Sequence, residues 1–274
     1  MSKVWFVTGS SRGLGRAVVT AALDAGDRVV ATARDPRQLG DLVAQYGDRV
    51  LPLALDVADD AAVRAAVKAG HEAFGRLDVV VNNAGYGDLA AVEDVDLADF
   101  KAQIDTNFYG VVHVSKAVVP ILREQGSGHL VQVSSIGGRV GSVGLAAYQS
   151  AKWAVGGFST VLAQEVAPFG VKVTVLEPGG MRTDWSGSSM VIPPISDPYR
   201  ATVGASAERR RASTGTEPTD PAKVAAVIRD LAGRDDAPLR LLIGTDAYAL
   251  AAAASRTQAE SDEHWRAVSE SVSA

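Results

Sequence analysis

The chain has 274 residues, of which 47% are hydrophobic and 22% charged, and we expect one soluble domain over residues 1–274. A net charge of −5 without a basic stripe argues against nucleic acid as a partner. The absence of cysteine excludes disulfides, thiol nucleophiles and thiolate metal sites, and we find no metal site in the histidine spacing. The apolar run at residues 4–7 is too short for a signal peptide, and no apolar run reaches membrane-spanning length. We therefore expect a cytoplasmic protein without membrane insertion.

A glycine-rich turn follows the first predicted strand, residues 4–8, and precedes a helical pattern over residues 16–25. Strand, glycine turn and helix form the context of a phosphate-binding loop, because glycines let the backbone approach a pyrophosphate and the helix N-terminus offers free N–H groups. The alternative is a tight turn that only packs the helix on the strand. The candidate cofactor-binding residues of this turn are Gly9, Ser11, Arg12, Gly13, Leu14 and Gly15.

The second predicted strand, residues 28–32, leads into Ala33, Arg34, Asp35 and Pro36. In dinucleotide-binding folds an acidic residue at this strand end binds the ribose 2′-hydroxyl, whereas arginine suits a 2′-phosphate. Asp35 before Pro36 is typical of a helix N-cap with proline at the first helical position. Arg34, with Arg12 as a second cation, therefore favours NADP over NAD, and solvated surface arginines are the alternative explanation.

Further strands are predicted over residues 49–55, 77–81, 128–134, 171–176 and 239–243, and they alternate with helices over residues 61–74, 97–123, 147–166 and 221–232. This alternation predicts an α/β fold, a doubly wound parallel sheet of about seven strands with helices on both faces. Ligands bind beyond the carboxyl ends of such strands. The candidate residues there are Asp56, Val57, Asn82, Ala84, Gly85, Ser135, Pro178, Gly179, Met181 and Thr183. For Asp56, contact with an adenine edge competes with capping of the next helix, which Asp59 or Asp60 could also perform.

Tyr148 and Lys152 lie four residues apart in the predicted helix 147–166, so they share one helix face. A nearby ammonium favours the phenolate and lowers the tyrosine pKa, which suits a proton donor and acceptor near neutral pH. An exposed pair that arose by chance is the alternative. Asn107 lies inside the predicted helix 97–123, where asparagine is unfavourable, so it either faces water or has a buried polar role.

Residues 184–220 lack a clear periodic pattern and are rich in Ser, Gly and Pro. A loop this long is usually functional, and we predict a lid over a substrate pocket. The simplest interpretation of the arginines at positions 209–211 is a solvated helix face. Residues 247–274 are predicted to form a helical C-terminal tail. The substrate candidates are Tyr86, Val140, Trp153, Trp185 and Met190, whose apolar character favours a hydrophobic ketone or aldehyde. A subunit interface is the alternative role for Trp153.

These motifs together resemble those of the short-chain dehydrogenase/reductase family over about residues 3–245. The matching residues are Thr8 to Gly15, Asn82-Asn83-Ala84-Gly85, Asn107, Ser135, Tyr148 with Lys152, and Pro178-Gly179 leading to Thr183. The resemblance implies a Rossmann-type fold, a nicotinamide cofactor and a catalytic tetrad of Asn107, Ser135, Tyr148 and Lys152, with Tyr148 and Lys152 also at the cofactor. It further implies that Arg34 and Arg12 select NADP(H) over NAD(H). The departures lie in the lid and the tail, so the resemblance implies no particular substrate.

The expected function is therefore hydride transfer between NADP(H) and a carbonyl or secondary alcohol, with Tyr148 as acid and base. Epimerisation or C=C reduction on the same fold is one alternative. A non-catalytic NADP(H)-binding sensor or scaffold is another, although such proteins commonly lose the tyrosine or the lysine. In many relatives the helices that carry Asn107 and Tyr148 form a dimer face, so the resemblance also implies a homodimer or homotetramer.

Overall fold

The computed structural model describes residues 2–185, 187 and 189–273. In this part of the chain seven parallel strands form one sheet in the order β3-β2-β1-β4-β5-β6-β7, which confirms the predicted fold. The strands are β1 (Val4–Val7), β2 (Arg28–Ala33), β3 (Val50–Ala54), β4 (Val79–Asn82), β5 (Gly128–Val133), β6 (Val171–Pro178) and β7 (Arg240–Ile243). The strand order reverses between β1 and β4, which is where doubly wound folds bind their ligands.

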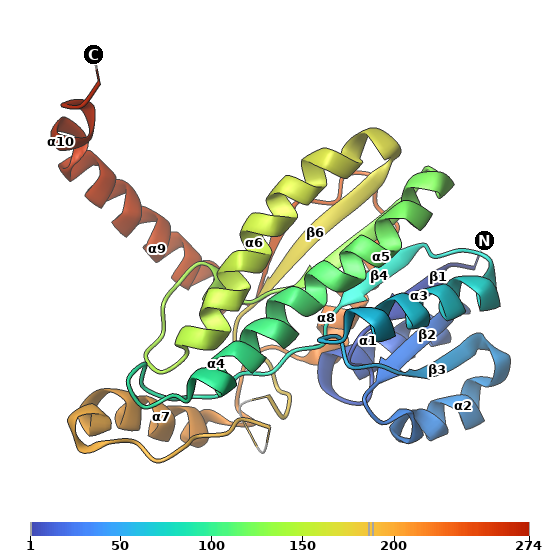
Figure 1. Cartoon of the computed structure of the whole chain (residues 1–274), viewed down its shortest axis with the longest axis horizontal. Coiled ribbons are helices and arrows are strands. Elements are labelled where there is room, and N and C mark those ends of the chain that lie inside the picture. The colour runs from blue at the N-terminus through green and yellow to red at the C-terminus, as the bar shows by residue number, and fades with distance from the viewer. Residues whose placement is uncertain (1, 186, 188, 274) are drawn as a thin grey trace.

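Helices cover both faces of the sheet (Figure 1). One face carries α1 (Gly13–Asp24), α2 (Gly40–Tyr46) and α8 (Pro221–Leu231), and the other carries α3 (Asp60–Phe74), α5 (Gly110–Gln125) and α6 (Ala146–Val166). Side chains alternate along each strand, so Trp5 and Val7 of β1 pack under the first layer while Val4 and Phe6 pack under the second. Burial on both faces explains why these strands are almost uniformly apolar.

The long helix predicted over residues 97–123 contains a local change of geometry. It consists of α4 (Leu97–Ile104), a π-helical turn at Asp105–Tyr109, and α5. Such turns are rare and often occur at functional sites. Here the turn carries Asn107, whose side chain is fully buried.

The lid segment contains more regular structure than the sequence suggested. It includes a 3-10 turn (Asp197–Tyr199), a π-helical turn (Arg200–Gly204) and the helix α7 (Ala205–Ser213). Three carboxylates of the loop after β4 accept hydrogen bonds from it: Asp88 Oδ1 from Val191 N (3.0 Å), Asp94 Oδ2 from Ser196 N (3.0 Å) and Glu93 Oε2 from Tyr199 Oη (2.7 Å). These contacts hold the predicted lid segment against the loop after β4.

The C-terminal residues form α9 (Thr245–His264) and α10 (Arg266–Glu270), which project away from the sheet (Figure 1). α9 buries Ala247 and Ala251 near its start, whereas Tyr248 and Leu250 remain largely exposed. Among the described residues, we find no helix with both the length and the hydropathy needed to cross a bilayer.

Candidate active site

The glycine loop after β1 has a backbone that other residues would not adopt easily. Gly9 and Gly13 have φ values of 68° and 56°, in the left-handed region that favours glycine. A Cβ on Gly15 would lie 2.2 Å from the carbonyl oxygen of Gly9. Arg12 is the N-cap residue of α1, and in the described chain neither a capping side-chain bond nor an acidic first turn occupies this end. The loop and the helix end thus fit an anionic group such as a pyrophosphate.

The two asparagines at the end of β4 both form hydrogen bonds to neighbouring strands, but with different partners. Asn83 Nδ2 donates to the carbonyl oxygens of Thr8 (2.9 Å) and Gly9 (3.1 Å) and so fixes the glycine loop. The Asn82 side chain donates to Gln132 Oε1 (2.8 Å) inside the sheet. Asn83 was not among the predicted site residues, and its only signal was its place directly after an apolar strand. A cofactor contact from Asn82 stays a prediction, limited to its backbone.

The two charged residues directly after β2 have different roles: Asp35 caps the next helix, and Arg34 is an exposed cation. Asp35 accepts from the backbone N–H of Arg37 (3.1 Å) and from its Nε (2.9 Å), which confirms the predicted cap, here of a 3-10 helix (Pro36–Leu39). These bonds lower the pKa of Asp35. Arg34 is exposed and forms no ion pair with the residues that the structure describes. Arg12 instead pairs with Asp184 at the start of the lid, at 3.0 Å.

The residues after β3 show which aspartate caps the next helix. Asp59, and not Asp56, accepts from the backbone N–H groups of Ala61 (2.9 Å) and Ala62 (3.0 Å) at the start of α3. Asp56 is exposed and makes only a local turn with the N–H of Ala58 (3.0 Å). Its other predicted role, at an adenine edge, stays a prediction. The neighbouring Val57 is buried, and it packs so closely on Gly110 that a Cβ on this glycine would lie 2.6 Å from Val57 Cγ2.

The structure brings Tyr148, Lys152 and Ser135 together below the lid. Tyr148 and Lys152 are 8% and 4% exposed, and the Lys152 Nζ lies 5.5 Å from the Tyr148 ring centroid. Nζ donates to the carbonyl oxygen of Val133 (2.9 Å), at the end of β5. Ser135 follows the same strand and lies within hydrogen-bonding reach of the Tyr148 hydroxyl. Strand and helix thus converge on one phenol.

Burial determines the protonation of this pair more strongly than mutual charge does. It raises the pKa of Tyr148 to about 12, and the hydrogen bond from Ser135 lowers that pKa only in part. Burial also lowers the pKa of Lys152 to about 8. The prediction that the Lys152 ammonium lowers the Tyr148 pKa is therefore wrong for this structure, because withdrawal of both groups from water disfavours both charges.

Asn107 places an unused acceptor beside Lys152. Its Nδ2 donates to the carbonyl oxygens of Tyr86 and Gln103, both at 2.8 Å. Its Oδ1 is buried without a partner among the described residues, which is costly unless a water or ligand donates to it. A Cβ on Gly85 would lie 2.5 Å from this oxygen and 3.6 Å from Lys152 Nζ. This arrangement fits a water bound between Asn107 and Lys152, two members of the tetrad that the resemblance implies.

The loop after β6 lies against the glycine loop and the start of the tail. A Cβ on Gly13 would lie 3.6 Å from Thr183 Cγ2, so these two segments touch. Asp246 in the first turn of α9 accepts from the N–H of Gly180 (2.7 Å), and a Cβ on Gly179 would lie 2.3 Å from its oxygens. Met181 pairs with Thr219 in an isolated bridge. Asp246 was missed because nothing in its local sequence points to this distant contact.

A buried carboxylate supports the loop that carries Ser135. Glu177, near the end of β6, is fully buried. It accepts from Arg139 Nε (2.8 Å) and from Arg240 Nε (3.0 Å). Its signal in the sequence is an acidic residue inside an otherwise apolar strand. A buried charge of this kind requires paired partners.

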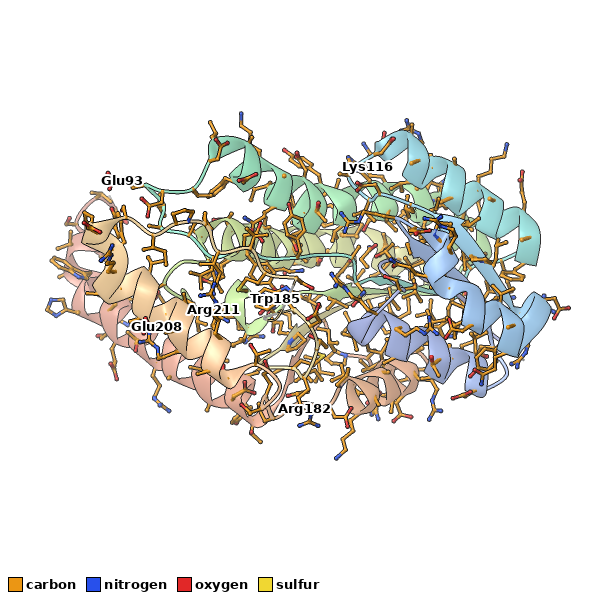
Figure 2. The ribbon with its side chains drawn as sticks, turned by 90° about the horizontal axis from the view of Figure 1, so that it is seen from below. Glu93, Lys116, Arg182, Trp185, Glu208 and Arg211 are labelled. Carbon is orange, nitrogen blue, oxygen red and sulfur yellow. The ribbon has the colours of Figure 1, made fainter. Side chains whose placement is uncertain are left out.

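Two of the five substrate candidates lie at Tyr148. The Trp185 ring is 4.8 Å from the Tyr148 ring, and Met190 is buried in the same cluster. Figure 2 views the molecule from the lid side, with Trp185 near its centre. Trp153 does not join them, because its side chain is 54% exposed on α6, which favours the interface alternative. The other candidates are Tyr86, whose carbonyl holds Asn107, and Val140, which is half-buried in the loop after Ser135.

The arginines at positions 209–211 do not share one environment. Arg209 and Arg211 are exposed, as a solvated helix face requires. Arg210 is half-buried, and its Cζ lies 6.0 Å from the Trp185 ring centroid. The predicted solvated face is therefore wrong for Arg210, because successive helix residues point about 100° apart.

Comparison with known proteins agrees with this geometry. The family model described as short chain dehydrogenase matches residues 3–190. Oxidoreductase BOA17 of Botryotinia fuckeliana is 62% identical over 270 residues, covering 98% of each chain. A short-chain dehydrogenase from Streptomyces avermitilis is 36% identical and superposes with a TM-score of 0.94 over all of both chains. An alcohol dehydrogenase from Thermococcus sibiricus, solved with 5-hydroxy-NADP, is 26% identical with a TM-score of 0.73, over 89% of this chain and 96% of that one.

The family match covers most of the chain, and the glycine loop and the tyrosine and lysine of α6 all lie inside it. The chain belongs to the short-chain dehydrogenase/reductase family of oxidoreductases.

Proposed function

We propose that the protein interconverts a carbonyl compound and its secondary alcohol with NADP(H), using Tyr148 as acid and base. The observation that carries this proposal is the convergence of Tyr148, Ser135 and Lys152 at the carboxyl ends of the strands, beside a glycine loop that fits a pyrophosphate. A nicotinamide bound there supplies or accepts the hydride. The remaining steps are proton transfers and positioning by the chain's own residues.

In the reducing direction Tyr148 donates its proton to the carbonyl oxygen. A phenol with a pKa of about 12 is protonated at neutral pH, which suits this role. Ser135 donates a hydrogen bond to the same oxygen and stabilises the charge that develops there. Lys152, with a pKa near 8, returns the proton to Tyr148, and Asn107 Oδ1 holds the water that connects Lys152 to solvent.

The preference for NADP(H) rests on the residues after β2. Arg34 is exposed and forms no ion pair within the described chain, so its guanidinium is available to bind a 2′-phosphate through its N–H donors. Asp35 is already engaged by Arg37 and does not compete for a ribose 2′-hydroxyl. The Thermococcus sibiricus relative, solved with 5-hydroxy-NADP, supports a nicotinamide cofactor of this type.

The surroundings of Tyr148 favour a substrate with an apolar body. Beneath the lid the phenol packs in one cluster with Leu89, Leu145, Met190 and Val203. Burial of apolar surface is the main source of affinity that such a lining can offer. We therefore propose a hydrophobic ketone or aldehyde as the reacting part of the substrate.

The test is consumption of NADPH by the purified protein over a panel of ketones and aldehydes. Tyr148→Phe should lower kcat by roughly 10²–10⁴-fold, as expected for loss of a general acid, with the Kd for NADPH nearly unchanged. Tyr248→Phe, on the exposed tail helix, is the matched control and should match wild type. Near wild-type reduction by Tyr148→Phe would sink the proposal. Tight NADPH binding by wild type without turnover of any carbonyl would favour the sensor alternative.

We also propose a homodimer or homotetramer. Trp153 and Val161 on α6 are 54% and 55% exposed, and Tyr109 before α5 is 48% exposed, so these neighbouring helices present apolar side chains to solvent. Light scattering after size-exclusion chromatography should give two or four times the mass of one chain. Trp153→Glu should shift the species toward monomer, and a monomeric wild type would refute the assembly.

A further inference from the structure

Arg210 is the one lid residue that brings a positive charge to the catalytic tyrosine in the described structure. Its Cζ lies 6.0 Å from the Trp185 ring centroid, and that ring lies 4.8 Å from the Tyr148 ring. The guanidinium is therefore one aromatic ring away from the phenol. Tyr148 and Arg210 also act on each other electrostatically: the cation lowers the pKa of Tyr148, and Tyr148 raises that of Arg210.

The protein gives this guanidinium no anionic partner within the described residues. Nε of Arg210 is buried and has no hydrogen-bond acceptor there, and no carboxylate forms an ion pair with the side chain. Burial lowers the pKa of Arg210, because it removes the charged group from water. The contrast is with Arg139 and Arg240, whose half-buried side chains share the carboxylate of Glu177. A buried donor without an acceptor is costly, so Nε is satisfied only when something else supplies an acceptor, and the adjacent positive charge favours an anion.

We propose that Arg210 binds a carboxylate on the substrate, so that the enzyme acts on oxo acids with an apolar body. This inference rests on the function proposed above and narrows its substrate class. The planar fork of the guanidinium matches a carboxylate with two parallel hydrogen bonds. A single negative charge fits better than a dianionic phosphate, because the neighbouring Arg209 and Arg211 are exposed and point elsewhere on α7.

The apolar lining and the arginine have complementary roles. Leu89, Leu145 and Met190 surround Tyr148 and fit the chain or ring of the substrate, while Arg210 fixes its charged end. The carbonyl then lies at the Tyr148 hydroxyl and the carboxylate on Arg210. The Trp185 ring contacts both Tyr148 and Arg210. A substrate that reaches from one of these side chains to the other must therefore lie along this ring. The separation between carbonyl and carboxylate is thus a selective feature of the site.

The experiment compares aryl and alkyl oxo acids, with the carbonyl at positions 2 to 6, against the methyl ester of each acid. The ester keeps the reacting carbonyl and the apolar body and removes only the charge. For the best-fitting chain length, wild type should show a kcat/KM for the acid at least about tenfold above that for its ester, as expected for one charge-assisted hydrogen-bonding partner. Arg210→Met should abolish this preference by lowering kcat/KM for the acid roughly 10–100-fold while leaving the ester within about threefold.

Matched variants on the same helix separate binding from folding. Arg209→Met and Arg211→Met should keep the preference for the acid, and Arg210→Lys should keep part of it. Thermal unfolding of all four variants identifies any that fail to fold. For a folded Arg210→Met, an equal fall in kcat/KM with acids and esters would overturn the inference. It would show that Arg210 acts on the protonation of Tyr148 and not on a substrate carboxylate.

The wild-type rates distinguish failure of this inference from failure of the proposed function. Efficient reduction of the esters without preference for any acid would refute the carboxylate site alone. Reduction of neither acids nor esters would refute the carbonyl activity on which it rests. A preference for phosphonate analogues over carboxylates would also overturn the inference, because it would require a second cation.

Discussion

Arg139 donates a hydrogen bond from Nε to the fully buried carboxylate of Glu177, at 2.8 Å, and so ties the loop after Ser135 to the end of β6. Arg240 of β7 holds the other carboxylate oxygen. One carboxylate thus connects three segments that are distant in sequence. The loop that it holds begins at Ser135, the serine proposed to orient the substrate oxygen.

Replacement of Glu177 by glutamine should destabilise the protein by about 3 kcal/mol, because it leaves two half-buried guanidiniums without their shared charge. The measurement is the free energy of unfolding from urea denaturation. The control is Asp236→Asn, which breaks the exposed pair with Arg234 and should change the free energy of unfolding far less, because water and salt screen exposed charges. Equal stability of the two variants would show that the buried triad contributes little.

Replacement of Arg34 by alanine should reduce the preference for NADPH over NADH. Loss of a charged contact to the 2′-phosphate is expected to lower kcat/KM for NADPH by roughly 10–100-fold and to leave NADH nearly unaffected. Arg37→Ala is the matched control, because Arg37 is a neighbouring exposed arginine already paired with Asp35. If wild type prefers NADH, or if both variants behave alike, Arg34 does not select the cofactor.

The rate of carbonyl reduction should fall as pH rises through about 8. Lys152, with a pKa of about 8, must be protonated to return a proton, whereas Tyr148, near 12, stays protonated throughout this range. Activity is therefore complete below pH 8 and lost above it, and alcohol oxidation should show the opposite slope. The measurement is kcat/KM for the carbonyl between pH 6 and pH 10. A flat profile would argue against Lys152 as the proton donor.

Acidification should destabilise the fold through His129. Burial of this side chain lowers its pKa to about 4 from 6.5. Between these values the unfolded chain binds a proton that the native protein excludes, so stability falls as pH drops from 6.5 toward 4, by up to about 3 kcal/mol. Urea denaturation at pH 7.5 and pH 5 should show this loss in wild type and less of it in His129→Gln. His264→Gln, on the exposed tail, should retain the full loss.

The fold could be predicted because its signals are local. Each buried strand is an apolar run of a few residues, and most are followed by glycine, asparagine or serine at the ligand-binding end. Asp35 with Pro36 likewise specifies a cap within two residues. The lid helix α7 lacked such a signal, because its nine residues, Ala205–Ser213, contain three arginines and few apolar side chains.

The rest of the site depends on contacts between distant segments. Glu177 meets Arg139, Asp246 meets Gly180, and Arg210 meets Trp185 only once the chain has folded. The direction of the Tyr148 pKa shift failed for the same reason. The spacing to Lys152 reveals a neighbouring charge, but it does not reveal how far both groups are removed from water.

The lid segment covers Tyr148. The phenol is 8% exposed against Trp185, and the segment is hydrogen-bonded to Asp88, Glu93 and Asp94, which all belong to one short stretch after β4. For the carbonyl activity proposed above, we expect these hydrogen bonds to break before a substrate enters and before its product leaves. The frequency of that opening would then set an upper limit on turnover, however fast the proton moves.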